Sequence, residues 1–343
     1  MVSTRAHIVA VALLAALPAS IASAQSPADF YKGRTVELDV GYSAGGAYDL
    51  YARTIARFLG RHIPGNPTVI VKNMEGGGSL RLANWLFRVA PKDGSVLATI
   101  GRGTGFDPIL GQAGAQFDGT KFTWLGSANN EVSVCVSWNA TSGISKFEDL
   151  FTKEITVGGT SMSADTDQFP KVIDGVFGAK MRIVSGYPGG NNVVLAMERG
   201  EIQGRCGWSW SSIMSTHKAW IDEKKITVLV QIALRKHAEL PNVPLIMDFA
   251  KTDEQKQILK LIFARQTMGR PYLAPPGIPA DRAAALRQAF MDTMADNDFL
   301  AEAEKEKLEI TPVDGADLQN LVAEVYATPA EIEKKAAALL NGQ

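Results

Sequence analysis

The chain has 343 residues, of which 46% are hydrophobic and 21% charged, and its formal net charge at pH 7 is -1. This near-neutral balance gives no electrostatic reason to expect binding to nucleic acid or to an anionic membrane surface. The length exceeds what one small hydrophobic core requires and predicts two lobes.

Residues 1–24 are typical of a secretory signal peptide. Arg5 supplies a positive start, an apolar run follows over Ile8–Leu17, and Ala22-Ser23-Ala24 is a small-residue cleavage sequence. The apolar run is far shorter than the ~20 residues that a membrane-spanning helix needs. We therefore expect cleavage between Ala24 and Gln25 and export of the mature chain to the periplasm.

Short β-branched runs alternate with helical patterns along the mature chain, as is typical of an α/β fold with mainly parallel sheets. The expected strands are Thr35–Val40, Thr68–Val71, Val96–Ile100, Val132–Val136, Ile155–Val157, Arg182–Val184 and Thr227–Ile232. The expected helices are Tyr48–Ile63, Ser79–Val89, Thr166–Phe177, Asn191–Arg199, Ser211–Lys224, Asp281–Lys307 and Ala316–Leu340. The Pro-rich segment Arg270–Pro279 disfavours helix and suits a crossing between lobes.

The two cysteines, Cys135 and Cys206, both lie in apolar, strand-like runs. An oxidising compartment allows a disulfide between them, whereas buried free thiols are also common in such runs, so both states stay open. The mature histidines, His62, His217 and His237, are dispersed and show no metal-ligand spacing. No P-loop or GxGxxG spacing is present either, and we expect no metal and no cofactor.

Four Gly/Ser-rich turns follow expected strands and precede expected helices. In chain order, the first to the fourth turn are Gly41–Asp49, Glu75–Ser79, Gly158–Asp165 and Tyr187–Asn192. Ligands of open α/β sheets bind at this carboxyl edge, and helix N-termini bind anions through backbone N–H groups. One such turn is often a plain connection, but four of the same polarity predict a site for a small carboxylate. The candidate ligand-binding residues on the turns are Tyr42, Ser43, Gly45, Gly46, Asp49, Gly77, Gly78, Ser79, Thr160, Ser161, Ser163, Asp165, Tyr187 and Gly189.

The first turn offers both backbone donors and a charged pair. Replacing Gly45 or Gly46 by a β-branched residue is expected to abolish binding, through a clash or a lost positive φ. Asp49 is poorly suited to touch an anion because like charges repel. It can instead favour the dipole of its helix and pair with Arg53 at i, i+4.

The same turn contains Gly41-x-Ser43-x-Gly45, the letters of a hydrolase nucleophile elbow. In an α/β-hydrolase the serine comes after several strands and after an oxyanion loop. Here Ser43 follows the first strand of the mature chain, and His62 lies at the far end of the helix that follows. A secreted serine esterase that uses Ser43 is therefore the alternative to a binding protein, and we expect no enzyme.

Six short motifs then occur in order along the mature chain: Ala44–Asp49 with Arg53, Val69–Asn73 with Gly76–Gly78, Ala90–Leu97, Gly186–Gly189, Arg235–Pro244 and Pro271–Pro279. Together they resemble the Bug-type extracytoplasmic solute-binding receptors of tripartite tricarboxylate transporters. The resemblance implies a two-lobe Venus flytrap of the type II periplasmic-binding class. Lobe I would comprise residues 25–126 and 264–343, and lobe II residues 127–263. A monomer would capture a small organic mono- or dicarboxylate, without catalysis, and deliver it to membrane subunits of the transporter.

The segment Gly204–Trp210 is bulkier than this family leads us to expect, with Arg205, Trp208 and Trp210. Arg205 and Arg102 are further candidate ligand-binding residues, because an inward-facing arginine can hold a carboxylate bidentately. Each could instead be a surface or interlobe arginine. The tryptophans could stack on an aromatic acid or simply pack.

Overall fold

The computed structural model describes residue 2 and residues 25–341, so the expected signal peptide and its cleavage site fall almost wholly outside the described residues. Within the described ranges, none of the helices combines the length and the apolar character that crossing a bilayer requires.

Two sheets organise the described chain. The strands are β1 (Thr35–Val40), β2 (Thr68–Asn73), β3 (Val96–Thr99), β4 (Thr123–Ser127), β5 (Ser133–Trp138), β6 (Ile155–Gly158), β7 (Met181–Val184), β8 (Gly204–Ser209), β9 (Ile226–Ile232), β10 (Pro271–Ala274) and β11 (Val313–Asp314). The helices are α1 (Pro27–Tyr31), α2 (Ala47–His62), α3 (Leu80–Arg88), α4 (Asp165–Phe177), α5 (Gly190–Glu198), α6 (Trp210–Thr216), α7 (Lys218–Asp222), α8 (Asp253–Phe263), α9 (Ala280–Met294), α10 (Asn297–Lys305), α11 (Gly315–Tyr326) and α12 (Ala330–Asn341).

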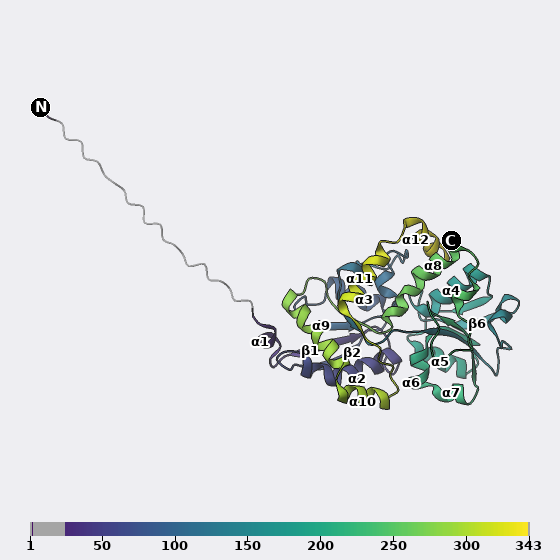
Figure 1. Cartoon of the computed structure of the whole chain (residues 1–343), viewed down its shortest axis with the longest axis horizontal. Coiled ribbons are helices and arrows are strands. Elements are labelled where there is room, and N and C mark those ends of the chain that lie inside the picture. The colour runs from purple at the N-terminus through teal and green to yellow at the C-terminus, as the bar shows by residue number, and fades with distance from the viewer. Residues whose placement is uncertain (1, 3–24, 342–343) are drawn as a thin grey trace.

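The first sheet has the order β11-β4-β10-β3-β1-β2 and the second the order β7-β6-β8-β5-β9. We call the part built on the first sheet lobe I and the part built on the second lobe II; they lie side by side in Figure 1. The expected α/β class with two lobes is confirmed. Parallel pairing is confined to β2-β1-β3 and β7-β6-β8, and the remaining pairs are antiparallel. The strands that run against the others are β5, β10 and β11, and of these β5 and β10 are the first strands after the chain crosses from the other lobe.

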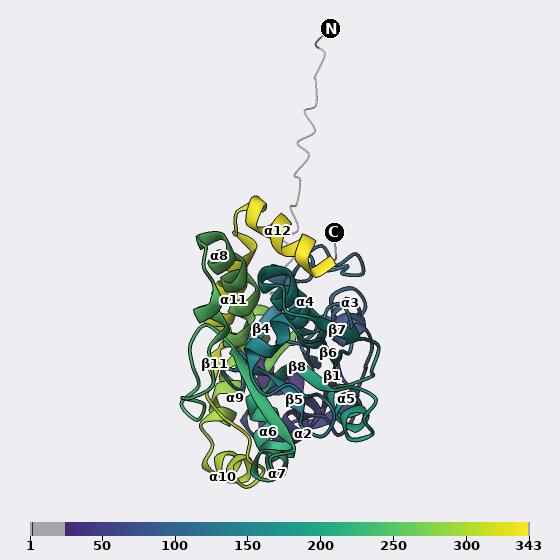
Figure 2. The same ribbon diagram turned by 90° about the vertical axis from the view of Figure 1, so that its right-hand side faces the viewer.

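The central strands of both sheets are buried on both faces, whereas the edge strands β2 and β7 are partly exposed. Alternate residues of a strand point to opposite sides, so consecutive residues of a central strand join different apolar clusters. In β5, Val134 joins the apolar cluster under α5, α6 and α7, whereas Cys135 joins the cluster under α4, α8 and α12. In β3, Leu97 packs with the cluster of α2 and α9, and Ala98 with that of α3 and α11. The last helix, α12, packs against α4 and α8 (Figure 2). The residue boundaries expected for the lobes stay a prediction.

Three of the expected helices are interrupted. The stretch 281–307 divides into α9 and α10 where the Asp296 side chain caps α10 by accepting the N–H groups of Asp298 and Phe299. The stretch 316–340 divides before Pro329, which cannot continue a helix, and the stretch 211–224 divides at His217. The apolar periodicity of the sequence continues across each break, because the helices on both sides of it pack an apolar face.

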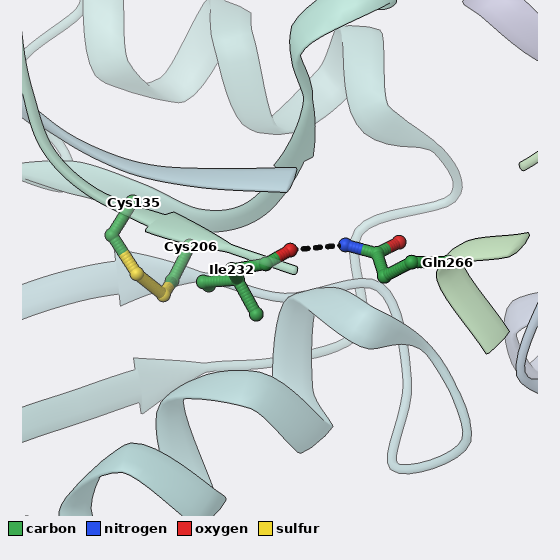
Figure 3. The surroundings of a disulfide bond; sticks show 4 residues. All are labelled: Cys135, Cys206, Ile232 and Gln266. Atoms are coloured by element: carbon green, nitrogen blue, oxygen red, sulfur yellow. Dashed lines mark hydrogen bonds between the residues drawn. A yellow bond between two sulfur atoms is a disulfide. The ribbon is translucent and has the colours of Figure 1, made fainter. Parts of the chain in front are cut away.

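Cys135 on β5 and Cys206 on β8 form a disulfide between neighbouring antiparallel strands, with their Cα atoms 3.9 Å apart (Figure 3). Both residues are buried. Near the disulfide, the side chain of Gln266 donates a hydrogen bond to the carbonyl of Ile232 at the end of β9. The structure thus selects one of the two cysteine states that the sequence leaves open.

Candidate ligand-binding site

A cavity of about 80 Å³ lies between the lobes, at the carboxyl ends of strands from both sheets. Its walls are largely small and polar, and they include the N-terminal residues of α2, α4 and α5. Lobe I contributes Tyr42, Ser43, Gly45, Gly46, Ala47, Tyr48, Gly101, Arg102 and Gly103. Lobe II contributes Thr160, Ser163, Ala164, Asp165, Thr166, Gly190, Asn191, Val194, Arg205, Gly207, Trp208, Ser209, Ser212, Thr216 and His217.

The structure brings many of the candidate residues to this cavity and leaves others outside it. The lining includes Tyr42, Ser43, Gly45, Gly46, Arg102, Thr160, Ser163, Asp165 and Arg205. The lining does not include Asp49, Gly77, Gly78, Ser79, Ser161, Tyr187 and Gly189. Several residues of this second group contact neighbouring turns rather than line the cavity.

The first and fourth turns meet across the cleft. Ser43 Oγ donates to Asn191 Oδ1 at 3.0 Å, and Asn191 Nδ2 donates to the carbonyl of Ala44 at 3.2 Å. A Cβ atom on Gly189 would lie 2.1 Å from Ser43 Oγ, so only glycine allows this approach. These contacts join the N-terminal ends of α2 and α5.

The second and third turns meet in the same way. Ser163 Oγ donates to the carbonyl of Gly77 at 2.5 Å. Gly78 has a φ of +63°, and a Cβ atom there would lie 2.3 Å from Ser161 Oγ. Ser79 Oγ donates to the carbonyl of Gly41 at 3.2 Å, which ties the second turn to the first. The four turns therefore close the cleft in two facing pairs.

Asp49 is engaged within lobe I. Its carboxylate accepts the backbone N–H of Gly45 at 2.9 Å, a side-chain N–H of Asn73 at 2.9 Å and the guanidinium of Arg53. These hydrogen bonds lower the pKa of Asp49 against the opposing effect of burial, which is the largest single cause. The expected pair with Arg53 at i, i+4 is present. The carboxylate fixes the backbone of the first turn through Gly45 without lining the cavity.

Arg102 reaches from lobe I into lobe II. It is only 3% exposed, its Nε lies 2.5 Å from Asp165 Oδ2, and its Nη2 donates to Ser209 Oγ at 2.7 Å. Arg265 contacts the other oxygen of Asp165 at 3.2 Å. Asp165 is thus shared between two arginines, while Arg102 Nη1 is buried without a hydrogen-bond partner.

Arg205 extends from β8, and its guanidinium carbon lies 4.7 Å from the ring centroid of Trp208. Its Nη1 donates to the carbonyl of Gly190 at 3.1 Å, and its Nε is buried without a hydrogen-bond partner. Among the described residues it forms no ion pair with a carboxylate. Burial, with the charges of Arg102 and Arg270 beside it, lowers the pKa of Arg205 to about 9.

The rest of the lining adds no negative charge. Arg270 lies behind the cavity and pairs with Glu131 at 3.3 Å. His217 packs its edge against Trp208 with 5.4 Å between ring centroids, and burial lowers its pKa to about 4, so the ring is neutral at pH 7. Arg102 and Arg205 against Asp165 leave one positive charge in excess on the cavity wall.

Sequence reasoning missed the polar end of β8 and the start of α6, including Ser209, Ser212 and Thr216. The sequence here does show a strand-like run followed by a helical pattern, but the turn between β8 and α6 contains no glycine pair. Tyr48 was also missed because it reads as an apolar helix position; its hydroxyl donates to the carbonyl of Gly269 at 3.2 Å.

The arrangement around Ser43 is not that of a nucleophile with its base. Ser43 Oγ bonds Asn191, and no hydrogen bond joins it to a histidine among residues 25–341. His62 instead contacts Asp296 at 2.7 Å, and His237 lies 3.7 Å from Glu309.

No protein-family model matches the chain, and no curated protein of similar sequence is found. Solved structures do match. The periplasmic binding protein BugD is 18% identical with a TM-score of 0.72, over 89% of this chain and 98% of that one. MatC from Rhodopseudomonas palustris, solved with bound malate, is 16% identical with a TM-score of 0.69, over 88% of this chain and 99% of that one. R. palustris Rpa4515, solved with adipate, is 15% identical with a TM-score of 0.67, over 89% of this chain and 97% of that one. The two-lobe fold of these periplasmic binding proteins is therefore shown for this chain.

Proposed function

We propose that this chain is a Bug-type periplasmic solute-binding receptor. It captures a small organic carboxylate between its lobes and delivers it to the membrane subunits of a tripartite tricarboxylate transporter. The observation that carries the proposal is the interlobe cavity, whose wall has one positive charge in excess and includes the N-terminal residues of α2, α4 and α5.

The chemistry of the walls suits a carboxylate. Each helix N-terminus stabilises an anion by roughly 0.3–1 kcal/mol, and by more where the site is partly buried. Hydroxyl and backbone N–H donors form charge-assisted hydrogen bonds with a carboxylate, which are stronger than neutral ones. The Thr160–Thr166 pair of lobe II offers such a hydroxyl, since either of the two can donate, and Arg102 lines the same cavity from lobe I, so one ligand can contact both lobes.

The comparisons support the same class of ligand, since MatC was solved with malate and Rpa4515 with adipate on a shared fold. The proposal includes cleavage of residues 1–24, a periplasmic location and action as a monomer without catalysis. It also includes the division into residues 25–126 with 264–343 and residues 127–263.

The test is a thermal-shift screen of the mature chain, residues 25–343, followed by calorimetry of each positive acid. The panel contains malate, succinate, adipate, acetate and benzoate, with glucose as an uncharged control. A ligand at 100 times its Kd stabilises the folded state by ~2.7 kcal/mol, which is a clear shift in Tm. At least one carboxylate should give this shift.

If no carboxylate stabilises the protein, the proposed function is wrong. The esterase alternative is checked on the same preparation with a chromogenic ester. We expect no hydrolysis above that of a Ser43→Ala variant, and turnover that disappears in this variant would favour the enzyme instead.

A further inference from the structure

The charges around the cavity do not balance. Arg102 and Arg265 share the carboxylate of Asp165, and Arg270 pairs with Glu131. Arg205 is the guanidinium on the wall for which the described residues supply no carboxylate. A buried charge without a partner is costly, so a site that keeps one is poised for a ligand of opposite charge.

Arg205 is also held in a fixed position. The face of Trp208 supports its guanidinium, and the carbonyl of Gly190 accepts from its Nη1. A Cβ atom on Gly190 would lie 2.5 Å from Nη2 of Arg205, so glycine at this position makes room for the guanidinium. The unpartnered Nε belongs to a rigid, planar fork that matches the two oxygens of a carboxylate.

A second set of donors lines the cavity. Arg102 Nη1 is buried without a partner, on a side chain only 3% exposed, and the wall also includes the first residues of α2 and α4. Each helix N-terminus acts as roughly half a positive charge. With the excess guanidinium of Arg205, the cavity presents more positive charge than one carboxylate neutralises.

We infer, on the basis of the proposed function, that the ligand is a dicarboxylate and that Arg205 selects its second carboxylate over a neutral group. The donors of Arg102 and the helix N-termini hold the first carboxylate. The negative charge of Asp165 is already shared by two arginines, so it attracts a ligand ammonium only weakly, which disfavours amino acids. Trp208 lines the cavity but is only 1% exposed and packs against Arg205, so little of its ring is open to stacking by an aromatic acid.

The experiment compares ligands that differ by one charge at nearly constant shape. Calorimetry of the mature chain uses succinate against succinamate and adipate against adipamate. A charge-assisted contact of this kind corresponds to about 10–100-fold in affinity, so the dicarboxylate of the fitting length should bind at least tenfold more tightly than its monoamide.

The variant Arg205→Gln should lose this discrimination. We expect it to weaken dicarboxylate binding by about 10–100-fold and to change monoamide binding by less than about threefold. Arg205→Lys, which keeps the charge but not the planar fork, should lie between the two. Arg199→Gln is the matched control, because Arg199 is exposed at the end of α5 and lies outside the lining.

The outcomes separate the two proposals. If neither acids nor amides bind, the proposed function fails. If carboxylates bind but the wild type does not prefer the dicarboxylate, this inference fails and the proposed function stands. If the wild type prefers the dicarboxylate but Arg205→Gln weakens both ligands equally, only the role of Arg205 fails. Folding of Arg205→Gln is checked by its Tm, which we expect to equal or exceed that of the wild type because an unpaired buried charge is removed.

Discussion

At the scale of the residue, the charged side chains of Arg205 and Asp39 show how the surroundings of a group decide its role. Arg205 faces a polar cavity and is neutralised by a ligand in our proposal. Asp39 on β1 is 1% exposed, and its Oδ2 is buried without a hydrogen-bond partner. Burial, with the charge of Glu37 on the same strand, raises the pKa of Asp39 from 3.8 to about 7. A protonated carboxyl here belongs to the structure of lobe I rather than to the ligand.

Asp39 should make stability depend on pH. Because its pKa is raised on folding, the folded state holds the proton more tightly than the unfolded state. The free energy of unfolding should therefore fall as the pH rises from about 4 to about 7 and stay lower above that. Asp39→Asn should flatten this slope and gain on the order of 1–3 kcal/mol at pH 8. Urea unfolding at pH 5 and pH 8 measures both effects, with exposed Asp292→Asn as the control; parallel profiles for wild type and Asp39→Asn would refute the assignment.

At the scale of the element, local sequence patterns predicted the helices and strands that are determined by residues close together in the chain. The strand–turn–helix unit of β1 and α2 was expected nearly to the residue, because Val36, Leu38 and Val40 alternate and Tyr51, Ile55 and Leu59 recur on one helix face. The short strands β10 and β11 were not expected. They are strands only because β4 and β3 offer partners, and the Pro-rich sequence of β10 reads as an extended connection.

Two glycines in the turn before α2 look equivalent in the sequence but have different backbone conformations. Gly45 has a φ of +80° and donates its N–H to Asp49, whereas Gly46, the N-cap of α2, has a φ of -85°. A left-handed conformation costs an L-residue roughly 1–2 kcal/mol, so Gly45→Ala should weaken ligand binding or stability by about that amount. Gly46→Ala should change both much less. Calorimetry and urea unfolding of the pair test this; equal effects would show that φ is not what makes Gly45 necessary.

At the scale of the whole molecule, the sequence indicated four turns at one edge but could not pair them. Arg102 and Asp165 are 63 positions apart, and their ion pair exists only because the two sheets face each other. For the same reason, the sequence showed that Arg205 and Trp208 are unusual residues at these positions but not where their side chains point. Long-range electrostatics of this kind depends on the assembled lobes, since no local pattern encodes which partner a buried guanidinium meets.

The contacts between facing turns should set the balance between open and closed forms. Asn191 makes two of them, to Ser43 and to Ala44, whereas its neighbour Asn192 has only a 3.5 Å contact with Ser43. Hydrogen bonds of this kind contribute about 0.5–1.5 kcal/mol each, so Asn191→Ala, which removes two, should lower the ratio of closed to open molecules about 5–150-fold. The apparent affinity for the ligand falls with the fraction of closed molecules.

Small-angle X-ray scattering of the ligand-free protein and calorimetry with the best carboxylate measure the two quantities together. Asn191→Ala should increase the radius of gyration and weaken binding, while Asn192→Ala should stay within about twofold of the wild type, because it retains both strong contacts. A saturating ligand should return the scattering of both variants to that of the closed form, since the ligand itself bridges the lobes. Weaker binding by Asn191→Ala at an unchanged radius would mean that Asn191 contacts the ligand directly instead of holding the turns together.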